Sequence, residues 1–489
     1  MTRVVKTPQA QLGEIAISAI KINPRSRDDI PQILQGLQYL YITPLLKTAL
    51  FSALEKLIPA GIDSNRGRPG MELWRIFVMG TLRLNINWDY DRLHEMVNCH
   101  ITIREMLGHS GFGESYKYSL QTIKDNVALI TPEILDEINQ VVVNAGHDLV
   151  KKKETEPTLR GRGDSFVVET DVHYPTDLNL LYDAMRKVIA SVSQESERGK
   201  AEGWRQYQHN IRQVKRAYRK AEKSKRGGYK DQDKETRRLE KVKEAHKSYI
   251  ELANDFLQKA LKTQEELQKE DRYNEINWLM IADYIHHANR QIDQISRRVL
   301  DGEIIPHSEK VFSLFEPHTE WISKGKAKAP VELGLRVCIM EDQFGFVLHH
   351  RVMEKEADVH IAIPMVKETK ERFPNFIACS YDKGFYSKDN KAALKEELNT
   401  VILPKKGRLN KQEKEEESNP DYIKRRYQHA AVESGINALE VHGLDRCLDH
   451  GLDGFKRYVA LAVVARNIQQ IGAILRSRKK QRLLIKKAA

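Results

Sequence analysis

The sequence predicts a mixed α/β protein in which a helical domain precedes a sheet core and a large helical insertion interrupts that core. Three patterns predict this class. The first 155 residues or so carry apolar residues at helical spacing, and β-branched runs with a period of two begin at Phe166 and return at Glu332. Between them, residues 179–300 are charge-dense, contain no proline and keep helical spacing. With 489 residues, the chain is long enough for two to four domains.

Composition favours a protein that binds a polyanion. Charged residues make up 30% of the chain and apolar residues 40%, the net charge is +12, and the pI is about 9.2. The four cysteines form no C-x-x-C pair, so we expect reduced thiols and no zinc site. No run of about 18 apolar residues and no signal peptide is evident, so we expect a cytoplasmic protein without a membrane span.

Residues 1–155 are predicted to form a helical domain. Helical spacing covers 33–58, 71–84, 90–97 and 120–129, and Gly67-Arg68-Pro69-Gly70 breaks the pattern. Ser119 is a suitable N-cap for the last of these helices. Short helices with tight turns are typical of a helix-turn-helix DNA reader, but an ordinary helical bundle has the same pattern. Both interpretations stay open.

Residues 179–330 are predicted to form a basic helical insertion with Gly227-Gly228 at the tip of a helical hairpin. The segment from Arg212 to Arg226 has eight Lys or Arg in fifteen residues and one acid, Glu222. A solvated helix face would explain such a run, but the bias of sign favours contact with phosphates. The residues expected to contact DNA here are Arg212, Lys215, Arg216 and Arg219.

The sheet core is predicted from segments on both sides of the insertion, 156–178 and 331–475. Residues 151–163 are polar and predict a linker, and a strand follows from Phe166 to Pro175. The later elements are strands at 332–341 and 344–353, a helix at 364–373, a strand at 375–382, a helix at 388–398, a strand at 400–403, a polar loop at 405–421 and a helix at 427–441. Without the insertion, this is the element order of an RNase H-like fold.

Three acidic residues stand in distinct contexts along this core. Asp164 precedes a β-branched run, Asp382 ends an apolar strand, and Glu433 lies in the last predicted helix. In an RNase H-like fold, the first strand, the fourth strand and a late helix bring carboxylates to one edge of the sheet. Oxygen ligands suit Mg²⁺, and a pair of such ions can hold the attacking and leaving oxygens of a phosphoryl transfer.

The contexts of these acids resemble those of bacterial insertion-sequence transposases of the DDE class. The stretch from Asp164 to the Tyr-Pro-Thr-Asp that ends at Asp177 is similar to their first-carboxylate motif. The segment from Tyr381 to Ser387, Tyr-Asp-Lys-Gly-Phe-Tyr-Ser, is similar to the second. Val432-Glu433-Ser434, with the later Asn437-Ala438-Leu439, Gly451 and Arg466-Asn467, is similar to the third.

The resemblance implies a function and a set of ligands. Asp164, Asp382 and Glu433 would bind two Mg²⁺ ions, with Mn²⁺ as a substitute, and the protein would cleave the ends of a DNA element and join the 3′-OH ends to target DNA. It would act as a homodimer on DNA and associate with the nucleoid. Lys383, Arg426 and His429 are the expected DNA contacts near the site.

The third motif departs from the family pattern. Where relatives often carry Tyr, Arg and Lys around the Glu, this chain has Arg426, His429 and Glu440. His429 can still donate to a phosphate, but Glu440 cannot replace a lysine. The expected DNA contacts on this helix are therefore Arg426 and His429, without a counterpart of the lysine.

Two further assignments stay open. Asp171 is an alternative to Asp164 as the first carboxylate, because more apolar sequence precedes it. Residues 476–489 form a basic tail that could follow a DNA backbone without reading its sequence.

Three other functions also fit: a catalytically inactive DNA-binding relative, an RNase H-fold nuclease that cuts without joining, and a helical nucleic-acid-binding scaffold led by residues 179–300.

Overall fold

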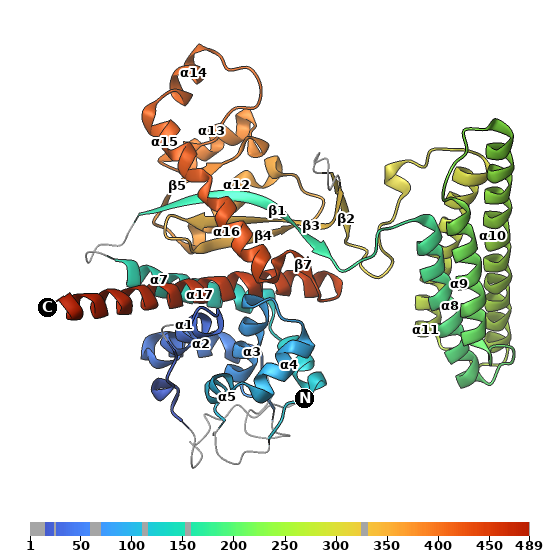
Figure 1. Ribbon diagram of the computed structural model, residues 1–489, viewed down its shortest axis with the longest axis horizontal. Helices are drawn as coiled ribbons and strands as arrows, with labels where there is room; N and C mark the ends of the chain where they lie inside the picture. The colour runs from blue at the N-terminus through green and yellow to red at the C-terminus, as the bar shows by residue number, and fades with distance from the viewer. Residues whose placement is uncertain are drawn as a thin grey trace. The chain divides into compact units, whose positions relative to one another are not determined.

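The computed structural model describes residues 15–23, 26–58, 70–109, 116–151, 158–323 and 331–488. The protein is mixed α/β, 65% helical, with a mixed sheet of seven strands in the described residues. It divides into two compact units, Met1–Asp171 with Glu320–Ala489, and Val172–Thr319 (Figure 1). The sequence prediction had set the limits of the insertion at 179 and 330 instead.

The first unit begins with helices, as the periodicity predicted. They are α1 (Ile30–Ile42), α2 (Pro44–Glu55), α3 (Leu73–Asn85), α4 (Tyr90–Cys99), α5 (Ile101–Met106), α6 (Leu120–Val127) and α7 (Pro132–Val150). Ser119 caps α6 by accepting a hydrogen bond from the Thr122 N–H, 3.1 Å away. The helix predicted from Ile33 to Ile58 is divided at Thr43, because Pro44 disfavours helical geometry in the residue before it. The predicted break at 67–70 lies outside the described residues except for Gly70.

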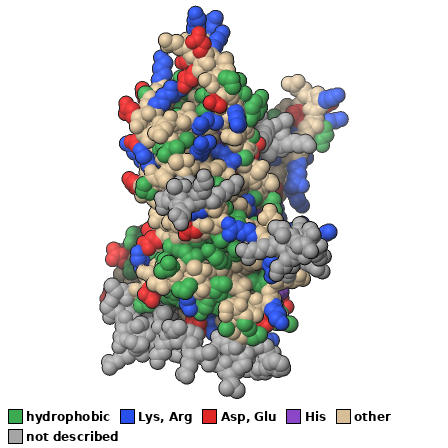
Figure 2. All heavy atoms as spheres, turned by 90° about the vertical axis from the view of Figure 1, so that its left-hand side faces the viewer, with side chains coloured by type: hydrophobic (Ala, Val, Ile, Leu, Met, Phe, Trp, Pro, Cys, Tyr) green, Lys and Arg blue, Asp and Glu red, His purple; other side chains and the backbone are tan. Residues whose placement is uncertain are grey.

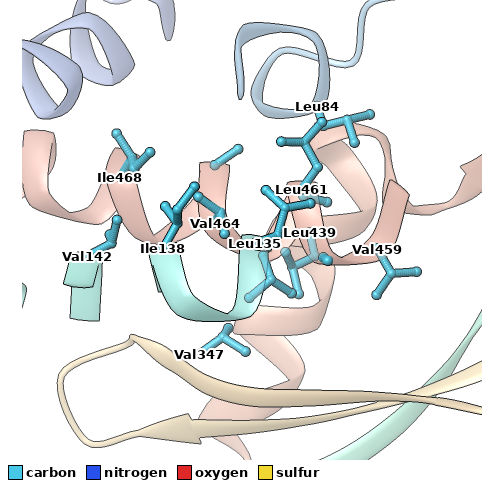
Figure 3. Close-up of a cluster of buried hydrophobic side chains, with 14 of the residues drawn as sticks. Leu84, Leu135, Ile138, Val142, Val347, Leu439, Val459, Leu461, Val464 and Ile468 are labelled. Carbon is cyan, nitrogen blue, oxygen red and sulfur yellow. The ribbon is translucent and has the colours of Figure 1, made fainter. Parts of the chain in front are cut away.

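The N-terminal helices share one hydrophobic core with the sheet. Leu135 and Ile138 of α7 and Val347, the first residue of a strand of the sheet, pack with Leu461 and Val464 of the last helix, α17 (Gly451–Ala488) (Figure 3). In Figure 1, α17 runs between the sheet and the helices α1 to α5, and α7 lies alongside α17. The helices predicted as a separate domain at 1–155 therefore form part of the same compact unit as the sheet.

The length and composition of α17 would let it cross a membrane, but 72% of its apolar window is buried inside the protein. A buried apolar helix of this kind is consistent with the core of a soluble protein. Residues 476–488, predicted as a basic tail, continue α17.

The sheet is centred on β1 (Leu159–Thr170). It pairs antiparallel with β3 (Val331–Asp342) and, on its other side, parallel with β5 (Phe376–Tyr381) and with the short β7 (Arg446–Cys447). Beyond β5 lies the parallel strand β6 (Thr400–Ile402). Two antiparallel strands, β2 (Glu320–Ser323) and β4 (Val347–Met353), pair with β3.

The first strand begins earlier than predicted. Leu159 to Gly163, predicted to be linker because residues 151–163 are polar and charged and contain Pro157, forms the first part of β1 and pairs with β5. The glycines are required by packing. A Cβ at Gly161 would overlap the Phe376 ring and the Met340 sulfur, and one at Gly163 would overlap Tyr381. Asp164 consequently lies inside a strand, with ladder partners on β3, instead of at the start of one.

The helices after β4 also differ from the prediction. The first, α12 (Asp358–Arg372), begins six residues before Pro364, which lies inside the helix and not in its first turn. After it come α13 (Lys388–Glu397) and α14 (Lys411–Glu417), the latter within the predicted polar loop. The predicted helix at 427–441 is two helices, α15 (Pro420–His429) and α16 (Ala431–Leu439), that meet at Ala430.

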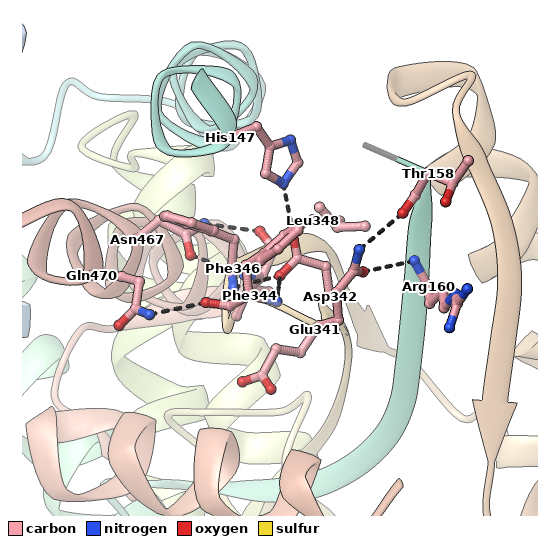
Figure 4. A network of polar contacts seen from close by, with 12 residues as sticks. His147, Thr158, Arg160, Glu341, Asp342, Phe344, Phe346, Leu348, Asn467 and Gln470 are labelled. Atoms are coloured by element: carbon pink, nitrogen blue, oxygen red, sulfur yellow. Dashed lines mark hydrogen bonds and ion pairs between the residues drawn. The ribbon is translucent and has the colours of Figure 1, made fainter. Parts of the chain in front are cut away.

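A polar network holds the turn between β3 and β4 (Figure 4). The buried Asp342 accepts hydrogen bonds from the Phe344 and Phe346 N–H groups and lies 2.6 Å from His147 Nε2 on α7. Gln343 bonds the Arg160 N–H and the Thr158 carbonyl, and so ties the turn to the first residues of β1.

The second unit is helical. Its main helices are α8 (Asp177–Gly199), α9 (Tyr207–Ser224), α10 (Gln232–Lys269) and α11 (Glu275–Ile295), followed by a π-helical turn at Ser296–Leu300. Gly227 and Gly228 lie between α9 and α10, as predicted for the tip of a hairpin. The unit has its own hydrophobic core, which includes Trp204, Tyr249 and Trp278.

Candidate active site

The candidate site lies where β1 and β5 run side by side. In this parallel pair Arg162 lies opposite Ser380 and Gly163 opposite Tyr381. The next residue on each strand is an aspartate, Asp164 on β1 and Asp382 directly after β5. Neighbouring strands are about 4.8 Å apart, so the sheet itself brings the two carboxylates together.

Backbone N–H groups hold both aspartates. Asp164 Oδ1 accepts from the Ser165 N–H at 2.8 Å. Asp382 caps the 3₁₀ turn Lys383–Phe385, and its Oδ1 accepts from the Gly384 N–H at 2.7 Å. Asp382 is exposed, whereas Asp164 is half-buried.

Glu433 enters from α16, which packs against β1. It lies in the first turn of that helix and is exposed. Just before it, α15 is joined to β5 by a 3.0 Å hydrogen bond between His429 Nδ1 and the Ser380 hydroxyl. The break at Ala430 thus places α15 over β5 and β6, and directs the first turn of α16 toward the aspartates.

Electrostatics show that the carboxylates act on one another. Burial and, to a smaller extent, the charges of Asp382, Asp358 and Glu433 together raise the pKa of Asp164 to about 7, against the opposing hydrogen bond from the Ser165 N–H. Burial lowers the pKa of His429, while Asp382 and Glu433 oppose that change. A site in which one carboxyl keeps its proton near neutral pH has an excess of negative charge and suits a cation.

Asp358 is a fourth acid in this site that the sequence analysis missed. It is the first residue of α12, and its Oδ1 accepts from the Ser165 hydroxyl at 2.6 Å. A Cβ at Gly384 would lie 2.9 Å from Asp382 Oδ1 and 3.3 Å from Asp358 Oδ2, so both carboxylates flank this glycine. An acid in the first turn of a helix is a recognised sequence signal, but it was hidden because the helix was predicted to begin at Pro364.

The donor atoms are suitable for Mg²⁺ or Mn²⁺, since all four side chains offer carboxylate oxygens. In the part of the chain that the structure describes, no group of three or more His, Cys, Asp or Glu side chains is drawn together tightly enough to hold a metal ion. The carboxylates are therefore neighbours without a closed ligand shell.

Asp171, the alternative first carboxylate, lies elsewhere. It follows the far end of β1, seven residues or about 23 Å of strand from Asp164. It is exposed, and its Oδ1 is 3.8 Å from Arg446 Nη1. The structure brings Asp164, and not Asp171, together with Asp382 and Glu433.

The expected DNA contacts fall into two groups. Lys383 and His429 adjoin the carboxylates, the first in the turn capped by Asp382 and the second beside Ser380. Arg426 is exposed on α15, three residues before His429. The other four residues are all exposed on α9 in the second unit, whose placement relative to the site is not defined: Arg212, Lys215, Arg216 and Arg219.

Comparison of the chain with protein-family models, with curated proteins and with solved structures gives no match in any of the three.

Proposed function

We propose that this protein is a DDE-type transposase with an RNase H-like core, which cleaves DNA at the ends of a mobile element and joins the 3′-OH ends to target DNA. The observation that carries the proposal is the placement of Asp164 and Asp382 one residue beyond the paired Gly163 and Tyr381, with Glu433 approaching from α16. The proposed fold is supported by the strand order, in which β1 lies between the antiparallel β3–β4 pair and the parallel β5–β6 pair.

In the proposed cleavage step, a water oxygen bonds to phosphorus, the P–O3′ bond breaks, and a 3′-OH and a 5′-phosphate remain. In the joining step, that 3′ oxygen bonds to a target phosphorus and a target 3′ oxygen leaves. In each step the attacking oxygen loses its proton to solvent and the leaving oxygen takes one up. The enzyme forms no covalent intermediate.

The protein groups have separate tasks in this proposal. Asp164, Asp382 and Glu433 would hold Mg²⁺, which when bound supplies positive charge to the phosphate and favours ionisation of the attacking oxygen. The Ser165 and Gly384 N–H groups fix the two aspartates. Lys383 and His429 would contact the DNA backbone next to the cleaved bond.

We extend the proposal to the partners of the protein. The exposed basic residues of α9 give the second unit a surface suited to DNA phosphates. Two element ends must be paired before joining, so the active form would be a homodimer on DNA, in the cytoplasm and associated with the nucleoid.

The test is an assay of the full chain with Mg²⁺ and a labelled duplex made from the DNA that flanks the gene, with a duplex of scrambled sequence as the control. A transposase produces a cut at the element end and a joined product, both absent with the scrambled duplex. Cutting of both duplexes without joining would identify a nuclease. Binding of the flanking DNA without cleavage would identify an inactive relative.

A further inference from the structure

A cavity of about 520 Å³ lies next to the carboxylates, between the sheet and α15. Its floor is formed by β1, β5 and β6, and its other side by α15 and the start of α16. This volume is within the range of small-ligand sites and can admit one nucleotide. The lining residues are Thr158, Arg160, Gly161, Arg162, Gln343, Ala378, Cys379, Ser380, Thr400, Ile402, Arg425, Gln428 and Ala431.

The charge of this cavity has one sign. Three arginines line it, and no acidic side chain does so among the described residues. Arg160 and Arg425 have no carboxylate partner within the described part of the chain, which leaves their guanidinium groups available to an anion. Arginine forms paired hydrogen bonds to phosphate oxygens, so a phosphate-containing ligand is the best match.

Arg162 is held in place by the protein. Its Nη2 donates to Glu341 Oε1 at 2.9 Å and to the Asp342 carbonyl, and its Nη1 is 3.5 Å from the Gln428 carbonyl of α15. Its Nε is buried and has no hydrogen-bond partner in the structure. Glu341 is 4% exposed, so this pair is fixed beneath the cavity and leaves Arg162 as a rigid part of the wall.

The cavity is aligned with the catalytic groups. Side chains two residues apart in a strand point to the same face and are separated by about 7 Å. Arg162 therefore lies on the face of Asp164 and two residues before it, and Ser380 has the same relation to Asp382. Because duplex DNA rises about 3.4 Å per nucleotide on each strand, the cavity begins roughly one or two nucleotides from a phosphate at the carboxylates.

We infer that this cavity binds the backbone of one DNA strand next to the cleaved phosphodiester, with Arg160, Arg162 and Arg425 on its phosphates and the apolar floor of Ala378 and Ile402 against a sugar or base. The inference rests on the proposed function, because the carboxylates define where the cleaved bond lies. The inference adds a phosphate subsite to the reaction centre, and this subsite would orient the DNA strand, which the carboxylates alone do not do.

The experiment measures DNA affinity by fluorescence anisotropy in EDTA, for the wild type and for Arg160→Gln and Arg425→Gln. The control is Arg27→Gln, which removes an exposed arginine from the segment before α1. We expect each pocket variant to raise Kd by about threefold to tenfold. The double variant should reduce the slope of log K against log salt by about 2, since each phosphate contact contributes about 0.9.

Position is tested with neutral methylphosphonate linkages placed one at a time along the strand. The wild type should lose affinity when a linkage one or two nucleotides from the cleaved bond is neutralised, and the double variant should lose nothing further there. If every protein cleaves the DNA and the pocket variants bind it as tightly as Arg27→Gln does, the subsite is overturned and the proposed function stays intact. Position-specific binding without cleavage would support the subsite and count against the function.

A free mononucleotide as competitor distinguishes the source of the phosphate. Displacement of DNA by micromolar deoxynucleotide, lost in Arg160→Gln, would mean that the cavity is a nucleotide site, and would overturn the assignment to a DNA strand. Displacement only by oligonucleotides supports it.

Discussion

Gly163 of β1 lies directly opposite Tyr381 of β5, and a Cβ at Gly163 would overlap the tyrosine ring. The ring is buried, stacks on Phe385, and donates its hydroxyl hydrogen to the Ala362 carbonyl of α12. The absence of a side chain at one residue thus lets the strands approach, and the next residue on each strand is a carboxylate of the candidate site.

Gly163→Ala should therefore lower the stability of the protein and also disturb the placement of the two site carboxylates that follow Gly163 and Tyr381. Tyr381 cannot move away without loss of its hydrogen bond, so we expect a decrease of about 1–3 kcal/mol in the free energy of unfolding. Urea unfolding measures this loss. Gly454→Ala in α17 is the matched control, since its Cβ would meet nothing closer than 3.4 Å, and it should change stability by less than about 1 kcal/mol. Equal effects of the two substitutions would contradict the packing argument.

Asp164 predicts a pH dependence of metal binding. Its pKa of about 7 means that the proton must leave before the carboxylate binds a cation. Mg²⁺ affinity should therefore rise between about pH 6 and pH 8 with release of one proton. Isothermal titration in buffers of different ionisation enthalpy measures that proton. A flat profile across this range would show that Asp164 does not bind the ion.

The same shift predicts the sign of a stability effect without metal. The folded state holds the Asp164 proton up to about pH 7, whereas the unfolded chain loses it near pH 3.9. The folded protein is therefore penalised as pH rises from about 4 to 7. Asp164→Asn should be more stable than the wild type at pH 8, by about 1–3 kcal/mol, and equally stable near pH 4. Thermal unfolding in EDTA at both pH values checks this, and a wild type that is the more stable at pH 8 would contradict it.

Asp358 should tune the site through its charge. Asp358→Asn keeps an acceptor for the Ser165 hydroxyl but removes a negative neighbour of Asp164. The midpoint of the pH dependence of Mg²⁺ binding should consequently move to lower pH, with cleavage within about tenfold of the wild type. Asp389→Asn on α13, which like Asp358 is an acid in the first turn of a helix, should leave the midpoint unchanged. A loss of cleavage comparable with that of Asp382→Asn would instead make Asp358 a metal ligand.

Gly435 should be coupled to Glu341. A Cβ at Gly435 in α16 would overlap the Oε2 atom of Glu341. Glu341 is the residue that holds Arg162, through its other carboxylate oxygen. Burial raises the pKa of Glu341 to about 7 against the opposing Arg162 and Arg466. Gly435→Ala should weaken DNA binding by displacing that carboxylate, and the shorter Glu341→Asp should restore part of the loss when combined with it. Additive losses in the double variant would show that the two sites are independent.

The sequence predicted the alternation of strands and helices in the core because β-branched runs and turn residues mark them. It did not predict that β1 begins at Leu159, since Arg160, Gly161, Arg162 and Gly163 have the composition of a linker. These residues form a strand because the rings opposite the glycines fill the missing volume, a tertiary effect that local pattern does not contain.

The same limit applies to the site. Motif context predicted Asp164, Asp382 and Glu433 as one site; the structure places the three near one another, and their catalytic role stays a prediction. It could not exclude Asp171, because only strand register shows which residue of β1 lies next to Asp382. Asp358 and the arginine-lined cavity depend on contacts between distant segments, and both were hidden by errors in the start of α12 and β1.

The most direct test of the central claim compares Asp382 and Asp171, two exposed aspartates that each directly follow a strand of the sheet. Cleavage of the flanking-end duplex with Mg²⁺ should fall at least about 100-fold in Asp382→Asn, because a ligand of the ion is lost. Asp171→Asn, at the far end of β1 and paired with Arg446, should cleave within about twofold of the wild type. Cleavage by Asp382→Asn at the rate of Asp171→Asn would contradict the assignment of the reaction to the carboxylates beside Gly163 and Tyr381.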